Sequence, residues 1–168
     1  SPETQVAVSC REFVEAFRRS ERLMFVWGQQ PGNRSRLEVV LSRFASEGSA
    51  VVLTEHLNPH SEKGFIWNFD ALMAGWDSSD ESAFVPDLLV TMGGHVVSKR
   101  LRKWLRNNPP HQHWHIGTSS PAPDTFQHLT HVIQADPEAF LCTLLHHLPP
   151  GDCDLSDSLQ RADCDRKW

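Results

Sequence analysis

The sequence has 168 residues, of which 39% are hydrophobic and 22% are charged, and these values are typical of one soluble domain with its own core. Its formal net charge of -5 disfavours nucleic acid or an anionic membrane as a partner of the whole chain. No apolar run approaches the roughly 20 residues that span a bilayer, and no signal peptide opens the sequence, so we expect a cytoplasmic protein.

Short apolar runs alternate along the chain with segments that carry apolar residues at helical spacing. The runs have the composition of parallel strands that are covered on both faces. We expect strands at 23–27, 50–53, 88–92, 113–117 and 129–133, and the main helices to begin near residues 9, 35, 97 and 137. Residues 65–73 are expected to form a short helix, and 77–82 (DSSDES) a solvated loop.

This alternation predicts the architecture of the domain. Strands and helices that follow one another at roughly 25 to 35 residues per unit are typical of βαβ units with parallel strands. The fold class is therefore α/β, with three layers: an open, mostly parallel sheet of five to six strands and helices on both faces, as in Rossmann-like domains.

The segment 87–106 (DLLVTMGGHVVSKRLRKWLR) is the most informative part of the sequence. A buried strand leads into a turn with Gly93 and Gly94, where the backbone could pass close to a ligand. The helix that follows has five basic residues in eight positions, and Lys99 and Arg100 come early in it. In an open parallel sheet ligands bind beyond the carboxyl ends of the strands, so these two cations are candidate ligands for a carboxylate or phosphate. The other three basic residues are expected on a solvated helix face.

Two other functions are compatible with the pattern. The first is a self-sufficient module that binds a nucleotide or sugar phosphate at Gly93 and Gly94, although the GxGxxG motif of dinucleotide sites and the P-loop order are both absent. The second is a small stand-alone hydrolase that uses Glu55, His56 and His60 in the loop after the second strand. Polar loops of this kind more often only solvate a turn.

The histidines and cysteines do not predict a metal site. Residues His111, His113 and His115 alternate and would share one face of a strand, as zinc ligands could. Neighbours on a straight strand do not converge on one ion, and no cysteine or aspartate completes the set. The four cysteines form no CxxC pair, so we expect free thiols.

The residues LLVTMGGHVVSKRL, followed by HWHIG, resemble the 2-succinyl-5-enolpyruvyl-6-hydroxy-3-cyclohexene-1-carboxylate synthase family of menaquinone biosynthesis. Members of this family have a pyrimidine-binding domain, a middle domain and a diphosphate-binding domain. The resemblance implies that residues 9–150 are the middle domain. Residues 1–8 would be a lead-in, and 151–168 a linker toward the C-terminal diphosphate-binding domain.

The resemblance also implies a function. The family uses thiamine diphosphate with Mg²⁺ (or Mn²⁺) to decarboxylate 2-oxoglutarate and add the succinyl unit to isochorismate, as a homo-oligomer. Its middle domain supplies a Lys-Arg pair to the substrate pocket, and Lys99 and Arg100 match this pair. The family's GDG motif is absent, because Gly151 and Asp152 are followed by Cys153. We therefore expect no catalytic residue, metal or cofactor in this segment and no activity of the segment alone.

Overall fold

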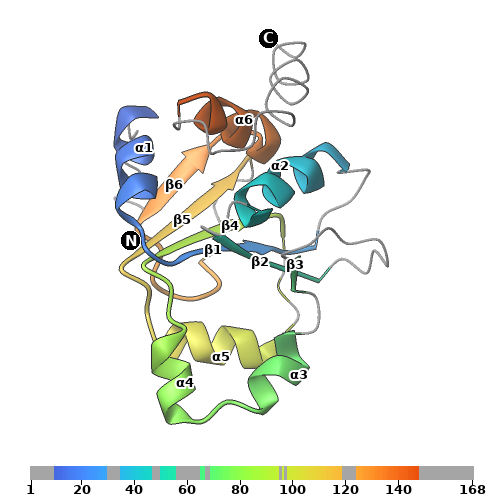
Figure 1. Ribbon diagram of the computed structural model, residues 1–168, viewed down its shortest axis with the longest axis vertical. Coiled ribbons are helices and arrows are strands. Elements are labelled where there is room, and N and C mark those ends of the chain that lie inside the picture. The colour runs from blue at the N-terminus through green and yellow to red at the C-terminus, as the bar shows by residue number, and fades with distance from the viewer. Residues whose placement is uncertain are drawn as a thin grey trace.

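A six-stranded sheet runs through the domain, and every pair of neighbouring strands in it is parallel. The computed structural model describes residues 10–29, 35–46, 50–55, 65–66, 69–94, 96, 98–118 and 124–147. The strand order is β3-β2-β1-β4-β5-β6 (Figure 1). The strands are β1 (Leu23–Trp27), β2 (Ala50–Thr54), β3 (Phe65–Ile66), β4 (Leu88–Met92), β5 (Gln112–Gly117) and β6 (His131–Gln134).

Helices cover both faces of the sheet (Figure 1). One face carries α1 (Cys10–Arg19), α2 (Ser35–Ser46) and α6 (Pro137–His147), and the other carries α3 (Phe69–Ala74), α4 (Ser78–Ala83) and α5 (Lys99–Asn107). The predicted three-layer α/β architecture is confirmed. None of the helices in the described residues is long and apolar enough to cross a membrane.

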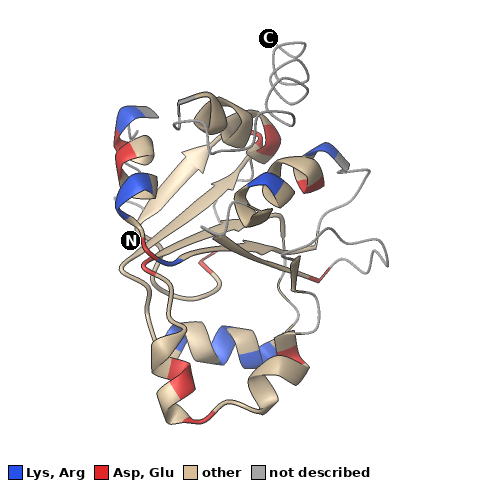
Figure 2. Ribbon diagram, viewed as in Figure 1, with Lys and Arg blue, Asp and Glu red and all other residues tan. Residues whose placement is uncertain are grey.

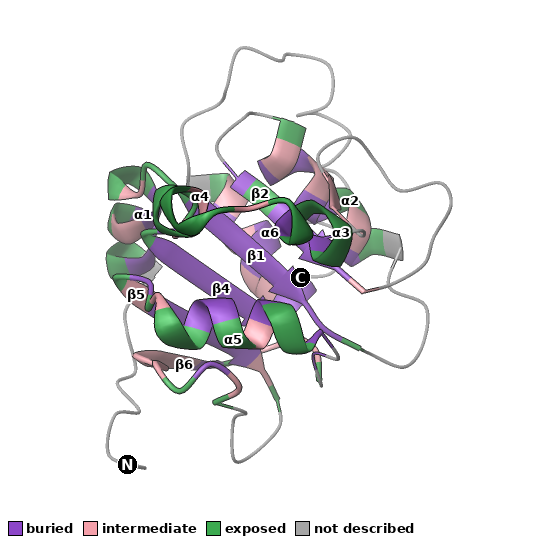
Figure 3. Cartoon of the chain, turned by 90° about the horizontal axis from the view of Figure 1, so that it is seen from below, coloured by how far each residue is buried: buried purple, intermediate pink, exposed green. Residues whose placement is uncertain are grey.

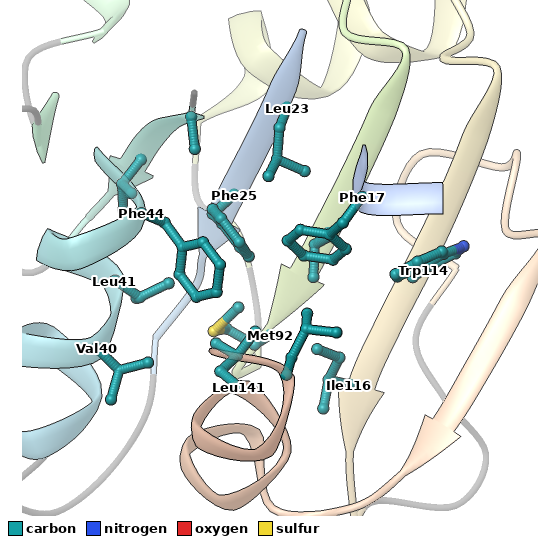
Figure 4. Close-up of a cluster of buried hydrophobic side chains, with 14 of the residues drawn as sticks. Phe17, Leu23, Phe25, Val40, Leu41, Phe44, Met92, Trp114, Ile116 and Leu141 are labelled. Atoms are coloured by element: carbon teal, nitrogen blue, oxygen red, sulfur yellow. The ribbon is translucent and has the colours of Figure 1, made fainter. Parts of the chain in front are cut away.

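Each face of the sheet has its own apolar core. On the side of α1, α2 and α6, the rings of Phe25 and Phe44 lie 5.2 Å apart and those of Phe17 and Trp114 lie 5.6 Å apart (Figure 4). On the other side, Leu89 of β4 packs with apolar residues of α3 and α5. Strands β1 and β4 are buried along their whole length, as the view from below shows (Figure 3). Their predominantly apolar composition, with Thr91 as the one polar residue, is explained by this two-sided burial.

The segment between β2 and β4 differs from the prediction. The prediction of a helix that begins at residue 65 was wrong, because the two-residue strand β3 comes first and α3 begins at Phe69. The prediction of a loop at 77–82 was also wrong, because α4 forms there. The Asp77 carboxylate accepts a hydrogen bond from the Asp80 N–H (2.9 Å), and the Asp80 carboxylate accepts one from the Asp77 N–H (3.0 Å). This reciprocal capping stabilises the first turn of a helix that buries no side chain.

The expectation of free thiols is wrong for Cys142, which is disulfide-bonded in the structure. Its side chain is buried on α6. A buried cysteine on a helix packs like a small apolar residue, so the sequence pattern around it does not reveal its oxidation state. Cys153 and Cys164 lie outside the described residues, as do the predicted lead-in 1–8 and linker 151–168.

The strand order reverses between β1 and β4, and the two loops that leave this point are held together. The Gly28 N–H donates to the Met92 carbonyl (2.9 Å), and the Gly94 N–H donates to the Gln29 carbonyl (2.7 Å). Gly93 has a φ of 79°, and a Cβ atom added there would lie 2.8 Å from the Gly28 carbonyl oxygen. Glycine is therefore required at 93 by both the backbone conformation and the close approach of the neighbouring loop.

We expect Gly93→Ala to lower the free energy of unfolding by about 1–3 kcal/mol, because a side chain is strained at this φ and collides with the β1 loop. Gly75→Ala is the matched control, since a Cβ there meets only the Leu72 carbonyl at 3.8 Å. It should change stability by less than about 1 kcal/mol. Urea unfolding of both variants measures the difference in stability. Equal losses would contradict the conclusion that glycine is required at position 93.

Candidate functional site

The site is built around the first turn of α5. Ser98 is the N-cap of this helix, and its Oγ accepts a hydrogen bond from the Leu101 N–H (3.1 Å). The same hydroxyl donates to Oδ1 of Asp70 on α3. The Ser98 N–H donates to Oε1 of Glu55, directly after β2 (2.8 Å). Two carboxylates from distant parts of the chain therefore bind the residue that opens the basic helix, where the positive end of the helix dipole favours them.

Lys99 and Arg100 follow Ser98 directly and have exposed side chains. Within the described part of the chain, neither cation forms an ion pair or a side-chain hydrogen bond. Both candidate residues therefore lie at the carboxyl-end edge of the sheet with their charges available to a ligand. The structure places them where the sequence predicted, on the helix that follows β4.

Lys99 and Arg100 line an open groove of about 1380 Å³ between α5 and the α3–α4 pair. Phe69, Met73 and Trp104 are buried residues that form its apolar part. The groove lining contains three cations and three carboxylates, and Figure 2 shows the basic positions of α5 beside the acidic ones of α3 and α4. The charged residues are Lys99, Arg100, Lys103, Glu55, Asp70 and Glu81.

Aromatic contacts fix the outer wall of the groove. The indole N–H of Trp104 on α5 donates to the Glu81 carbonyl on α4 (2.9 Å). Trp76 packs edge-on against Trp104, with ring centroids 5.0 Å apart, and stacks on Phe84. The indole of Trp104 thus buries its apolar body and satisfies its only donor, which ties α4 to α5.

The glycine turn after β4 does not have the geometry of a phosphate loop. The Gly94 N–H is already bonded to Gln29, and Gly93 packs against Gly28. A phosphate cradle needs free N–H groups directed at the ligand. The turn therefore fixes the path from β4 to α5, and the geometry disfavours the nucleotide-binding alternative.

The alternative hydrolase also lacks support. Glu55 is half-buried and accepts the hydrogen bond from Ser98, so it has a structural partner at the head of α5. His56 and His60 lie outside the described residues.

His113 and His115 share one face of β5, as predicted, and both bind one hydroxyl. Thr91 Oγ1 lies 2.8 Å from His113 Nε2 and 2.9 Å from His115 Nδ1. The hydroxyl has one proton, which it can donate to one ring or to the Trp114 carbonyl (3.4 Å), and a ring that does not accept it donates its own N–H. His111 is exposed and precedes the strand. No group of three or more His, Cys, Asp or Glu in the described ranges could hold a metal ion.

Burial keeps these two histidines neutral. It lowers the pKa of His113 to about 3, with a smaller contribution from the charges of His115 and His128, and it lowers the pKa of His115 to about 4. A neutral imidazole can both donate and accept, which is what the Thr91 contact requires. This cluster is a structural part of the sheet and lies outside the lining of the groove.

Sequence reasoning missed the roles of Glu55 and Asp70 at the α5 turn. Ser98 lies 43 residues from Glu55 and 28 from Asp70. The one local signal is Ser98 itself, a residue type that often caps a helix. The sequence did predict that Glu55 follows the second strand, and the structure has it directly after β2.

The strand order, the parallel pairing and the two helical layers define a Rossmann-like α/β domain. Two solved sirtuin structures share this fold. One, a Sir2 mutant with a p53 peptide and NAD, has a TM-score of 0.57 at 10% identity and is matched over 83% of this chain and 98% of its own. The other, from work on sirtuin substrate affinity, has a TM-score of 0.56. At this identity the likeness shows the fold alone, and no family model matches the chain.

The chain is related in sequence to the 2-succinyl-5-enolpyruvyl-6-hydroxy-3-cyclohexene-1-carboxylate synthases, which confirms the predicted resemblance. The enzyme of Flavobacterium johnsoniae is 36% identical over 143 residues, which cover 85% of this chain and 26% of that enzyme. The enzyme of Bacteroides thetaiotaomicron is 44% identical over 92 residues, which cover 54% of this chain and 17% of that enzyme. The chain therefore corresponds to a minor part of the length of these relatives.

The stability of the domain should fall as the pH is lowered from 6.5 toward 4. An unfolded histidine has a pKa near 6.5, so in this range the unfolded state binds more protons than the folded state, in which His113 stays neutral and His115 takes up a proton only near pH 4. Each histidine contributes at most about 1.4 kcal/mol per pH unit. Urea unfolding at several pH values measures the slope.

His115→Asn keeps a hydrogen-bonding group near the Nδ1 position but cannot titrate, so the slope between pH 6.5 and 4 should fall by up to about half. His111→Ala is the control, because His111 is exposed and has no contact with Thr91. A slope that is the same in His115→Asn and in the parent would show that the buried pair does not control this pH dependence.

Proposed function

We propose that this chain is the central domain of a thiamine-diphosphate-dependent synthase of menaquinone biosynthesis. In the complete cytoplasmic enzyme, 2-oxoglutarate is decarboxylated and the succinyl unit is transferred to isochorismate. The names and the identities of the related synthases support this proposal. The structural observation that carries it is that Lys99 and Arg100, at the head of α5, line a groove and form no ion pair with any described residue.

The pair is suited to hold a carboxylate of the substrate. A guanidinium group can form two parallel hydrogen bonds with a carboxylate, and a lysine adds a mobile point charge. Both substrates carry carboxylates, and fixing one of them orients the reacting carbon against the cofactor. Lys99 and Arg100 are thus substrate-binding residues in this proposal, and the chain supplies no catalytic residue.

Thiamine diphosphate and Mg²⁺ (or Mn²⁺) belong to the other domains in this proposal. The described part of the chain has no cluster of three metal-ligating side chains, and Gly94 is not free to hold a diphosphate. The residues present here therefore do not fit the cofactor, and no chemical step is assigned to them. The segment contributes the α/β scaffold, contacts with the two other domains and the carboxylate clamp, within a homo-oligomer. Alone, it has no activity.

Arg100→Ala in the complete enzyme should raise the KM of one carboxylate substrate by about 10-fold or more, because a charge-assisted hydrogen bond contributes about 1.5–3 kcal/mol. Lys99→Ala should have a smaller effect, since it removes one point charge without a planar pair of donors. Steady-state kinetics with each substrate varied in turn measures both.

Arg36→Ala is the matched control. Arg36 is an exposed arginine on α2, on the opposite face of the sheet, and lies outside the groove lining. It should leave both KM values as they are. Unchanged KM values for both substrates in a Lys99→Ala, Arg100→Ala double variant would contradict the proposal that these residues bind a substrate carboxylate.

A further inference from the structure

Ser98 joins three segments of the domain at the point where the candidate clamp begins. The residue is only 7% exposed. Its N–H binds Glu55 at the end of β2, and its hydroxyl binds Asp70 on α3 while accepting from Leu101 on α5. We propose that Glu55 and Asp70 are positioning residues, which hold the Ser98–Arg100 turn so that Lys99 and Arg100 face the substrate carboxylate. This inference rests on the function proposed above.

The first argument is geometric. Lys99 and Arg100 are exposed, and within the described residues no side-chain partner orients them. Their direction is therefore set by the backbone of the first helical turn. Ser98 is the only residue of that turn anchored from outside the helix in the hydrogen bonds described, through Glu55 and Asp70. A small rotation of the turn would displace both cations together.

The second argument is electrostatic. Two carboxylates beside a cationic clamp weaken its attraction for an anion, so their charge alone opposes the proposed binding. The hydrogen bonds to Ser98 favour binding of the anion, because they hold Lys99 and Arg100 in the geometry that binds it. The two effects can be separated by substitution, since an amide oxygen still accepts a hydrogen bond but carries no charge.

Glu55 should be the stronger of the two anchors. It is half-buried and binds a backbone N–H, whereas Asp70 is exposed and binds a hydroxyl. Water competes more effectively with a hydrogen bond on an exposed carboxylate. Removal of Glu55 should therefore disturb the turn more than removal of Asp70.

The test compares Glu55→Ala with Glu55→Gln in the complete protein that contains this chain. We expect Glu55→Ala to raise the KM of the carboxylate substrate about 10-fold with a change in kcat below about 3-fold. Glu55→Gln should recover most of that loss. Hydrogen–deuterium exchange, read from peptides that cover residues 98–107, should be faster in Glu55→Ala than in Glu55→Gln.

Glu81→Gln is the charge control. Glu81 also lines the groove, but its side chain does not bind Ser98. The variant removes the same charge without touching the turn, so it should not raise KM. If Glu55→Ala does not fold, Asp70→Ala and Asp70→Asn supply the same comparison at an exposed position, with a smaller expected effect.

Two results would overturn the positioning role. One is a Glu55→Gln variant as impaired as Glu55→Ala, which would show that the hydrogen bond to Ser98 is not what Glu55 contributes to binding. The other is a Glu55→Ala variant with unchanged KM and unchanged exchange in α5. The exchange measurement does not depend on the clamp. Faster exchange in Glu55→Ala, together with unchanged KM in the Lys99 and Arg100 variants, would contradict the proposed clamp. It would still support the role of Glu55 in holding the first turn of α5.

Discussion

The parallel pairing of β1 with β4 is the constraint on which the rest of the structure depends. Both strands are buried on both faces, and their loops are joined by the Gly28–Met92 and Gly94–Gln29 hydrogen bonds. Strand order reverses here, and in many α/β folds the diverging loops leave a crevice that binds a ligand. In this domain the loops close on each other instead. The groove beside them extends from Gln29 and Glu55, at the ends of β1 and β2, to the head of α5.

The basic helix α5 faces acidic side chains of the same domain across this groove. The groove lining combines three cations with three carboxylates, and one carboxylate, that of Glu55, is bound to the helix terminus. The Ser98 N–H and the Leu101 N–H at the head of α5 are thus satisfied from within the domain. Lys99 and Arg100, next to Ser98, are the two cations closest to the anchored helix terminus, and Lys103 lies one turn further along the same groove.

The sheet was predictable because parallel strands buried on both faces have a local signature. In β4, for example, five consecutive residues are buried, and four of them are apolar. The elements that were missed have no such signature. The α4 helix buries no side chain and is stabilised by Asp77 and Asp80, and β3 has only two residues. The residues of the site also fall into a predictable pair and a pair that the sequence does not reveal. Lys99 and Arg100 follow a strand and a turn in sequence, whereas Glu55 and Asp70 reach Ser98 only through the tertiary fold.

A groove whose charges balance must select its ligand by short-range geometry. Opposite charges within a few ångströms of each other largely cancel at the distance of about 8–10 Å over which salt screens an approaching ion. Long-range steering is then weak, and affinity depends on direct contact with Lys99 and Arg100. Contact of that kind is sensitive to small displacements of the donors. The first turn of α5 is accordingly anchored to β2 and α3, whereas the cations that it carries have no partner in the described part of the domain. Rigidity of the backbone together with free side chains is what a clamp completed by other domains requires.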